Sequence, residues 1–389
     1  MDSTRGAGVR SFARPWQPPT RIERALRATL GADDRDAYLR LLAGCDLFLY
    51  VPKEQADAGG SVRWGTCRDR RGAWCVAVRT AGARLPRRAH AVVQRTSLRA
   101  LAELWPDGRF GLCVNPGTPS ERTFPARHRH RRHWLRAAEG AGARRAALLT
   151  KYGGPTAGLL AQALACGAPL AVRDGVPWNE IGDAYDDYAL DARVLRASWA
   201  TATPAQWRSR MDALLTTRSG PAGPEFALGV RRRLAGAEGE RVPLDVWRDA
   251  CAAVLGARGM PEASGLAVQG AVGRIARHEA RFRADGLLPP DGWVRSTAAY
   301  DFGRAVAFAR RGLGARLCGG QEARDAILRA GALAGTRHTS WADFSAGYAL
   351  GRVLGVGADE SGPAYAAVLE PHRVLTADQE SPWRTLPWE

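Results

Sequence analysis

Residues 340–355 read SWADFSAGYALGRVLG, and this stretch decides the fold of the carboxy-terminal half. Ser340 stands three residues before Asp343, so its hydroxyl and the carboxylate are placed to cap the backbone amides of a helix start. Aromatic residues and glycines then form two stripes at helical spacing: Trp341, Phe344 and Tyr348, and Gly347, Gly351 and Gly355. Because a glycine inside a helix costs about 0.5 to 1 kcal/mol relative to alanine, the second stripe predicts a helix packed against bare backbone.

Residues 299–317, AYDFGRAVAFARRGLGARL, supply the expected partner helix. Its apolar residues follow one face: Ala299, Phe302, Val306 and Ala309. Asp301 and Arg304 lie within one turn, which indicates an intrahelical ion pair, with a ligand cleft as the alternative. The glycine stripe is also typical of membrane helix dimers, but the charges and the short length of the segment favour packing without membrane insertion.

The terminal segment SPWRTLPWE, residues 381–389, combines two prolines with Trp383 and Trp388. Burial of two indoles stabilises by at most about 8 to 12 kcal/mol. Ordering about eight residues costs roughly 1 to 2 kcal/mol each, so the two terms nearly cancel. We therefore expect docking only if the segment's amides find partners on its own domain or on another chain. As a partner-binding element, its deletion is predicted to weaken binding and leave the thermal midpoint almost unchanged.

The length of 389 residues and the 46% hydrophobic content predict two folded domains. The start of the chain lacks the apolar segment of a secretory signal, which predicts a cytoplasmic protein. A net charge of +17 favours an acidic partner such as nucleic acid. However, only Lys53 and Lys151 are lysines, and such arginine dominance is what a GC-rich coding sequence produces without functional demand.

Seven cysteines are scattered through the chain without zinc-site spacing: Cys45, Cys67, Cys75, Cys113, Cys166, Cys251 and Cys318. This pattern in a cytoplasmic chain predicts reduced thiols and no metal or cofactor. Cys75 and Cys113 lie in apolar runs, where a cysteine behaves as a small hydrophobe, with a catalytic thiol as the alternative.

Residues 1–31 are rich in proline and arginine and are interpreted as a mobile arm with one short helix near its end. From residue 32 to about 126 the pattern predicts a small α/β domain with a mixed sheet: a helix ending near Ala43 and strand-like runs DLFLYVP, SVRWGT, AWCVAVRT and AHAVVQRT. A helix capped by Ser97 and a further strand in FGLCVNPG follow.

The segment ELWPDGRFGLCVNPGTPSERTFPA, residues 103–126, carries a helix ending in Trp-Pro, a glycine, a strand and an Asn-Pro-Gly turn. In these features it resembles the SseB amino-terminal domain family of bacteria. The resemblance implies an accessory protein, because members of that family include proteins linked to type VII secretion.

Residues 127–150 contain the run RHRHRRHWLRAAEGAGARR and are interpreted as a solvated linker between domains. One alternative is a polyanion contact through Arg129, Arg131 and Arg132, with Trp134 stacking on a base. Another is a metal site formed by the run's histidines: His128, His130 and His133.

Residues 151–389 show only helical patterns, which predicts an all-α domain and an α+β chain overall. Within residues 197–215, Thr203 and Pro204 are typical of a helix start. The domain resembles the bacterial DUF1266 family, a domain of unknown function, through several segments in order: Trp178 and Asn179, residues 195–207, residues 300–311, residues 340–352 and residues 381–388. Tyr300 stands where relatives commonly have tryptophan.

The leading hypothesis is a non-enzymatic adaptor or chaperone-like accessory protein with an unidentified protein partner and no catalytic residues. The candidate interaction or packing residues are Trp341, Gly347, Gly351, Asp301, Arg304, Trp383 and Trp388. Nucleic-acid binding through the arginine-rich linker is the first alternative. An enzyme is the second, with an acidic site from the Asp301–Arg304 pair or from carboxylates at intervals of four, which would share a helix face and suit magnesium: Asp183, Asp187 and Asp191.

Overall fold

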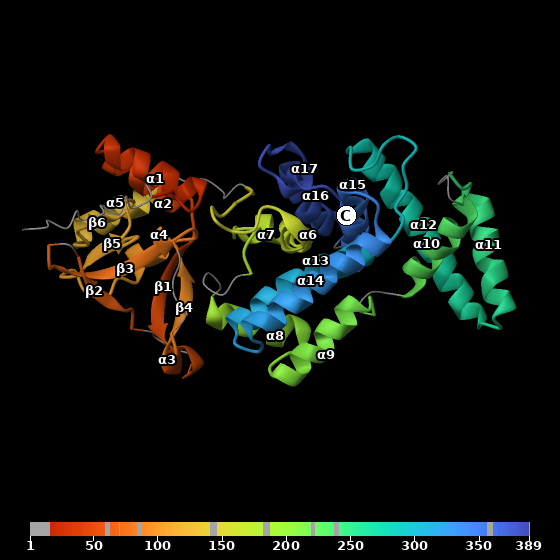
Figure 1. Cartoon of the computed structure of the whole chain (residues 1–389), viewed down its shortest axis with the longest axis horizontal. Helices are drawn as coiled ribbons and strands as arrows, with labels where there is room; N and C mark the ends of the chain where they lie inside the picture. Colours follow the sequence, from red (N-terminus) through yellow and green to blue (C-terminus); the bar gives the residue numbers. More distant parts are fainter. Residues whose placement is uncertain are drawn as a thin grey trace, which may run out of the picture.

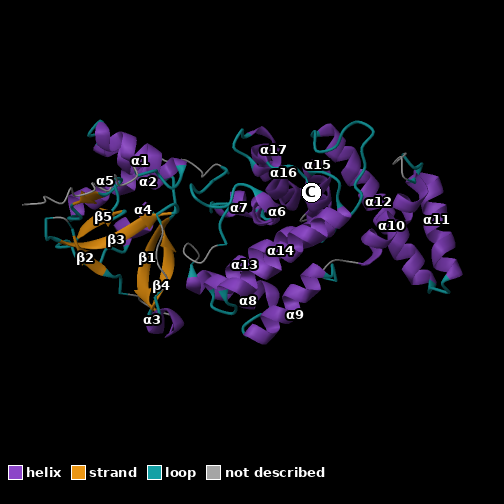
Figure 2. Cartoon of the chain, in the orientation of Figure 1, coloured by secondary structure: helices purple, strands orange, loops and turns teal. Residues whose placement is uncertain are grey.

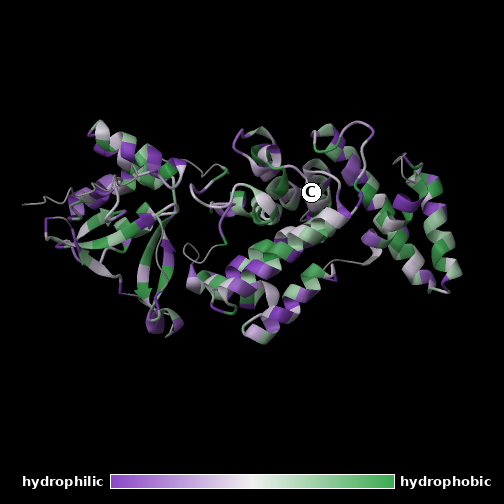
Figure 3. Cartoon of the chain, in the orientation of Figure 1, coloured by the Kyte–Doolittle hydropathy of each residue, from purple (hydrophilic) through white to green (hydrophobic). Residues whose placement is uncertain are grey.

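The computed structural model describes residues 16–58, 63–69, 71–83, 88–140, 146–181, 187–218, 222–236, 241–355 and 361–388. Figures 1 and 2 show a mixed sheet with helices in the amino-terminal part and helices throughout the rest, so the α+β class and the two-part organisation are confirmed. Figure 3 shows that the helices carry both hydrophobic and hydrophilic residues around their circumference, as partly buried helices do.

The sheet has the strand order β4-β1-β3-β5-β6, and β2 pairs with β3 on the side of the main path. Only the pairing of β3 with β5 is parallel, which makes the sheet mixed. The expected strands are present, with the second shifted to a short edge strand and with β6 added: β1 (Leu47–Pro52), β2 (Thr66–Arg68), β3 (Trp74–Thr80), β4 (Ala91–Thr96), β5 (Gly111–Val114) and β6 (Arg122–Phe124).

Five of the helices that the structure describes belong to this amino-terminal domain: α1 (Arg21–Gly31), α2 (Arg35–Ala43), α3 (Lys53–Ala58), α4 (Leu98–Glu103) and α5 (His128–Glu139). The short helix predicted near the end of residues 1–31 is present as α1, but it is not part of a mobile arm, because α1 packs on α2 and buries Leu26 and Glu23. The Glu23 carboxylate accepts hydrogen bonds from the Thr80 hydroxyl and the Gly82 amide, which ties α1 to the end of β3. Residues 1–15 lie outside the described residues.

Residues 128–139 also differ from the expected linker, because they form α5 and pack against α2 and α4. Trp134 is 1% exposed and contacts Trp105 edge to face, with 5.3 Å between ring centroids. A ring buried in this way is unable to stack on a base, so the sequence interpretation of Trp134 is wrong. The apolar positions of α5 decide its place, in spite of the arginines and histidines between them.

Twelve described helices form the second domain: α6 (Gly158–Cys166), α7 (Ala168–Asp174), α8 (Tyr188–Trp199), α9 (Pro204–Leu215), α10 (Ala222–Ala235), α11 (Leu244–Ala257), α12 (Glu262–Ala284), α13 (Ala298–Gly314), α14 (Gly320–Arg337), α15 (Trp341–Leu354), α16 (Ser361–Ala377) and α17 (Pro382–Thr385). Helix α13 lies at the centre and contacts α6, α7, α8, α9, α14 and α15. Helices α10, α11 and α12 form a lobe at the end far from the sheet (Figure 1). None of the described helices has the length and apolar composition needed to cross a membrane.

The glycine stripe of α15 lies against α13, as its spacing indicates. A side chain at Gly347 would collide with the Ser296 carbonyl oxygen, and a Cβ at Gly351 would lie 2.5 Å from the Cβ of Tyr300. Gly355 meets only its own helix and serves as the C-cap. Two of the three glycines therefore permit the close approach of α15 to α13.

The terminal segment docks on its own domain. The indole N–H groups of three tryptophans each donate to a backbone carbonyl: Trp383 to Ala165 at 3.1 Å, Trp341 to Leu386 at 3.0 Å and Trp388 to His338 at 2.9 Å. The ring of Trp341 stacks on Trp383 and meets Trp388 edge to face. We call these three residues the tryptophan cluster. The segment thus finds its partners on its own domain, which is the first of the two expected outcomes.

The two domains are in contact through charged side chains. The Arg316 guanidinium donates to the carbonyls of Arg88, Ala89 and Ala91 at the start of β4. In the reverse direction, Arg95 of β4 pairs with Asp46 and also donates to the Asp174 carbonyl at 2.9 Å. The sheet and the helical domain therefore hold each other at several points.

Candidate functional site

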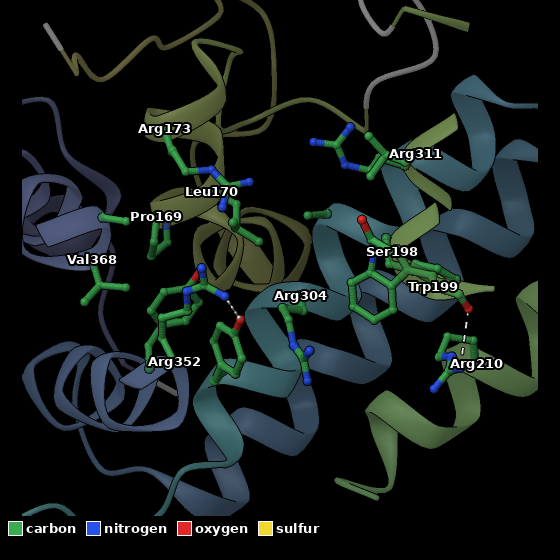
Figure 4. A pocket seen from close by; sticks show the side chains of 16 residues that line it. Pro169, Leu170, Arg173, Ser198, Trp199, Arg210, Arg304, Arg311, Arg352 and Val368 are labelled. Carbon is green, nitrogen blue, oxygen red and sulfur yellow. Dashed lines mark hydrogen bonds between the residues drawn. The ribbon is translucent and has the colours of Figure 1, made fainter. Parts of the chain in front are cut away.

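A pocket of about 420 Å³ opens in the helical domain around the middle of α13. Its lining comes from helices that are far apart in sequence: α7, α8, α9, α13, α15 and α16. Figure 4 shows the 16 lining side chains, with arginines on several sides of the space. Helix α13 contributes most of one wall, because residues three, four and seven apart share one helix face.

Five of the lining residues are arginines, and none of the 16 is a carboxylate: Arg173, Arg210, Arg304, Arg311 and Arg352. Arg304 and Arg311 are two turns apart on α13, while the other three come from α7, α9 and α15. Guanidinium groups stay protonated at any physiological pH, so the lining carries permanent positive charge.

Carboxylates outside the lining pair with three of these arginines, and the first of these pairs joins Arg173 to Asp174 at 2.9 Å. Arg311 donates to Asp174 at 2.8 Å and to Asp191 at 2.7 Å, and the side chain of Asp191 is 3% exposed. Arg304 pairs with Asp301 one turn earlier in α13. Burial raises the pKa of the Asp301 carboxyl above its ordinary value, and the Arg304 charge opposes that rise. The sequence pair thus forms, with Arg304 lining the pocket and Asp301 behind it.

Arg210 and Arg352 have only neutral hydrogen-bond partners among the described residues. Arg210 donates to the Trp199 carbonyl at 3.3 Å, and Arg352 donates to the Tyr300 hydroxyl at 3.2 Å (Figure 4). These bonds fix the direction of the guanidinium groups without neutralising them. The site therefore has unbalanced positive charge where Arg210 and Arg352 meet the cavity.

Aromatic rings pack around Arg304 and complete the wall. The Arg304 guanidinium lies 4.3 Å from the ring centroid of Tyr300 and 5.2 Å from that of Trp199, both within the range of cation–π attraction. Burial raises the pKa of the Tyr348 hydroxyl, so that this group stays protonated and remains a hydrogen-bond donor. Guanidinium and hydroxyl groups together give the pocket many donors, which suits an anionic ligand rich in acceptor oxygens.

Among the carboxylates at intervals of four, Asp187 and Asp191 each have a partner within the protein. Helix α8 begins at Tyr188, so Asp187 is its N-cap and accepts from the Leu190 amide at 2.8 Å. Asp191 lies inside the helix and is held by Arg311, while Asp183 lies outside the described residues. Both carboxylates therefore have donors within the protein, and the small cavity that they border is also lined by Arg95, Arg310 and Arg311, which does not suit magnesium.

The candidate polyanion contacts lie on α5, in the other domain. Arg129 and Arg132 are exposed, whereas Arg131 donates to the Ala102 carbonyl at 3.0 Å and helps to fix α5 on α4. His133 pairs with Asp36 at 3.0 Å. In the part of the chain that the structure describes, no three or more histidine, cysteine, aspartate or glutamate side chains gather as a metal site.

Sequence reasoning identified one of the five pocket arginines, Arg304. Arg173, Arg210, Arg311 and Arg352 were not proposed, because single arginines in an arginine-rich chain carry no local signal. One usable signal is the seven-residue interval between Arg304 and Arg311, which places two charges on one face of a mostly apolar helix.

Comparisons with known families agree with this architecture. A model described as "SseB protein N-terminal domain" matches residues 22–128, which include α1 and the start of α5. A model described as "Protein of unknown function (DUF1266)" matches residues 194–388, which contribute four of the five pocket arginines. No curated protein and no solved structure matches the chain. The chain belongs to the DUF1266 family, and an SseB amino-terminal domain precedes its DUF1266 region.

Proposed function

We propose that this protein is a non-enzymatic accessory protein whose helical domain binds a small organic anion with two or more phosphate or carboxylate groups. One observation carries the proposal: five guanidinium groups and no carboxylate line a single pocket. An arginine presents donors in a planar fork that matches the oxygens of phosphate and carboxylate groups. A positive lining of this kind is stabilised when such a ligand neutralises it.

The size of the pocket supports an organic ligand over a lone inorganic ion. Ligand sites in proteins typically occupy about 300 to 1,000 Å³, and the 420 Å³ of this pocket lies within that range. Apolar side chains such as Leu170 and Val368 also face the space, beside the ring of Trp199. These groups suit the uncharged body of a ligand, while arginines on different sides suit separate anionic groups.

A calorimetric titration of the full chain tests the proposal. The probes are inorganic phosphate, pyrophosphate, adenosine mono-, di- and triphosphate, and citrate. We expect binding by at least one organic polyanion, weakening as salt is added, because screening reduces attraction between charges. The variants Arg210→Ala and Arg352→Ala should each weaken binding about tenfold, because each removes a charged donor that has only a neutral partner.

Arg196→Ala is the matched control. Arg196 is exposed on α8 and lies outside the pocket lining, so its removal takes away the same charge from the same domain. Binding that is insensitive to Arg210 and Arg352, or equally sensitive to Arg196, would contradict a site in this pocket. If none of these probes produces a heat of binding at low salt, the proposed function is wrong.

A second candidate is contact with a polyanion along α5. Arg129, Arg132 and Arg136 are exposed at intervals of three and four, so they share one face of the helix. None of the three has an ion-pair partner within the described ranges. Binding to a generic DNA duplex should fall steeply with salt, and a triple change of these residues to glutamine should abolish it. Salt-independent binding would contradict this contact.

The adaptor role, and the secretion-associated role that the SseB resemblance implies, stay predictions about the protein partner. Affinity capture of the full chain from its host, with and without nuclease, separates protein partners from nucleic acid. Capture of the same protein by the chain and by its Arg352→Ala variant would place the partner contact away from the pocket. A partner lost with that variant would link the two.

A further inference from the structure

Three cysteines gather on the sheet although they are far apart in sequence. Cys67 lies on the edge strand β2, Cys75 on β3 and Cys113 on β5, and these three strands are neighbours. Cys67 and Cys75 are direct partners in the antiparallel register, and their Sγ atoms are 3.4 Å apart. Cys113 lies on β5, two residues along that strand from Gly111, which is the register partner of Cys75.

We propose that Cys67 and Cys75 are an oxidation site, at which a peroxide converts the two thiols into an intrachain disulfide. Directly opposed residues of an antiparallel pair have Cα atoms about 4.5 to 5.5 Å apart, inside the roughly 4.4 to 6.8 Å that disulfides span. The Sγ atoms therefore need to approach by only a small side-chain rotation. The backbone of the two strands stays in register.

Accessibility decides the order of the steps. Cys67 is half-buried, whereas Cys75 and Cys113 are fully buried, so the peroxide meets Cys67 first. The Cys67 sulfur attacks one peroxide oxygen, the O–O bond breaks, and a sulfenic acid and water form. The Cys75 sulfur then attacks the Cys67 sulfur, the S–O bond breaks, and a second water leaves. Overall, two thiols and one hydrogen peroxide give one disulfide and two water molecules.

The structural effect is a covalent clamp on the sheet edge. In the reduced state, β2 is held to β3 by a ladder of three residue pairs. Thr66 and Arg68, which flank Cys67, are exposed, so little apolar burial holds this strand. A bond between Cys67 and Cys75 closes the intervening turn into a loop and prevents the edge strand from separating.

Trypsin separates the three thiols, because each lies on a different peptide: residues 64–68 (WGTCR), 72–79 (GAWCVAVR) and 110–122 (FGLCVNPGTPSER). The full chain is treated with dilute hydrogen peroxide, alkylated, digested and analysed by mass spectrometry. We expect residues 64–68 joined to residues 72–79, a mass about 2 Da below the sum of the two peptides, and reversal by dithiothreitol. Two of the seven thiols should disappear from a count under denaturing conditions.

Variants separate this pair from its neighbour. Cys113→Ser should keep the cross-link, whereas Cys75→Ser should lose it and leave Cys67 as a sulfinic or sulfonic acid. Three results with the peroxide-treated protein that carries no substitution would each overturn the proposal: a cross-link from Cys75 to Cys113, a disulfide between two chains, or Cys67 oxidised to a sulfinic or sulfonic acid. The peptide map of the protein without substitutions shows whether Cys67 and Cys75 are joined, even if a cysteine variant fails to fold. It is also independent of the outcome for the anion pocket.

Discussion

In the α10–α12 lobe, the Arg231 side chain is 5% exposed and lies between the rings of Trp247 and Trp293, at 4.1 and 4.7 Å. It donates two hydrogen bonds to Glu279 and one to the Val294 carbonyl. In the pocket, Arg352 has a tyrosine hydroxyl as its partner and faces open space. Both arginines border a cavity, but the charge of Arg231 is neutralised by the buried Glu279, whereas Arg352 has no carboxylate partner among the described residues. This difference separates a structural arginine from a binding one.

The tryptophan cluster is a second group of residues with a structural role. Its removal is expected to cause the largest loss in the free energy of unfolding. Deleting residues 381–389 should lower the free energy of unfolding by roughly 5 kcal/mol, because truncating even one buried tryptophan costs about 3 to 5 kcal/mol. Chemical denaturation measures the loss, with the exposed Glu380→Ala as control. A free energy of unfolding that stays unchanged would show that the segment does not stabilise the domain and would favour the partner-binding hypothesis.

Arg231→Ala comes next, with an expected loss of about 3 to 5 kcal/mol, because it leaves Glu279 as an unpaired buried charge. The double variant Arg231→Met with Glu279→Leu should recover most of the stability, since it removes both charges and keeps the volume. Urea denaturation compares the two. If the double variant is as unstable as the single one, packing between Trp247 and Trp293 matters more than the unpaired charge.

The stability of the helical domain should depend on pH through the buried His372, whereas the pocket arginines stay charged throughout the same pH range. His372 is hydrogen-bonded to Ser345 at 2.7 Å, and burial lowers its pKa to about 4. Between about pH 6.5 and pH 4 the unfolded chain binds the extra proton, so the native state should lose at most about 3 kcal/mol as pH falls through this window. Unfolding at several pH values should show this slope reduced in His372→Asn. If the protein and its His372→Asn variant lose stability equally as the pH falls, another group is responsible for the acid sensitivity.

The smallest effect on stability is expected for substitution of Arg352 in the pocket. Arg352→Ala should change the free energy of unfolding by less than about 1 kcal/mol, because its guanidinium has no charged partner among the described residues and borders a cavity. The same urea denaturation used for Arg231→Ala provides the measurement. A cost as large as that of Arg231→Ala would show that Arg352 supports the fold, and the contrast drawn above would fail.

The features that the sequence predicted correctly are local ones. Ser340 caps α15 through the Asp343 amide at 3.1 Å, and Thr203 forms a capping box with Gln206, because such bonds join residues three apart. The stripe of Gly347 and Gly351 was equally readable from spacing. Helix α5 was misread because its charge outweighed the periodicity of its few apolar residues.

The pocket was out of reach for a different reason. Arg173, Arg210 and Arg352 belong to three helices separated by more than thirty residues along the chain, and only the packing of α7, α9 and α15 around α13 brings them together. Sequence spacing reports neighbours within one helix. It contains no comparable signal for which of many arginines converge, so the candidate site had to come from the fold.

Tyr300 forms part of the pocket wall, and its Cβ rests on the uncovered backbone of Gly351. The contour of the cavity is thus governed by a position that contributes no atoms beyond its own main chain. A single methyl group added there would push the tyrosine and deform the mouth from behind, without touching any ligand. A substitution at Gly351 in a relative would therefore change which ligands fit the pocket while every arginine stays in place.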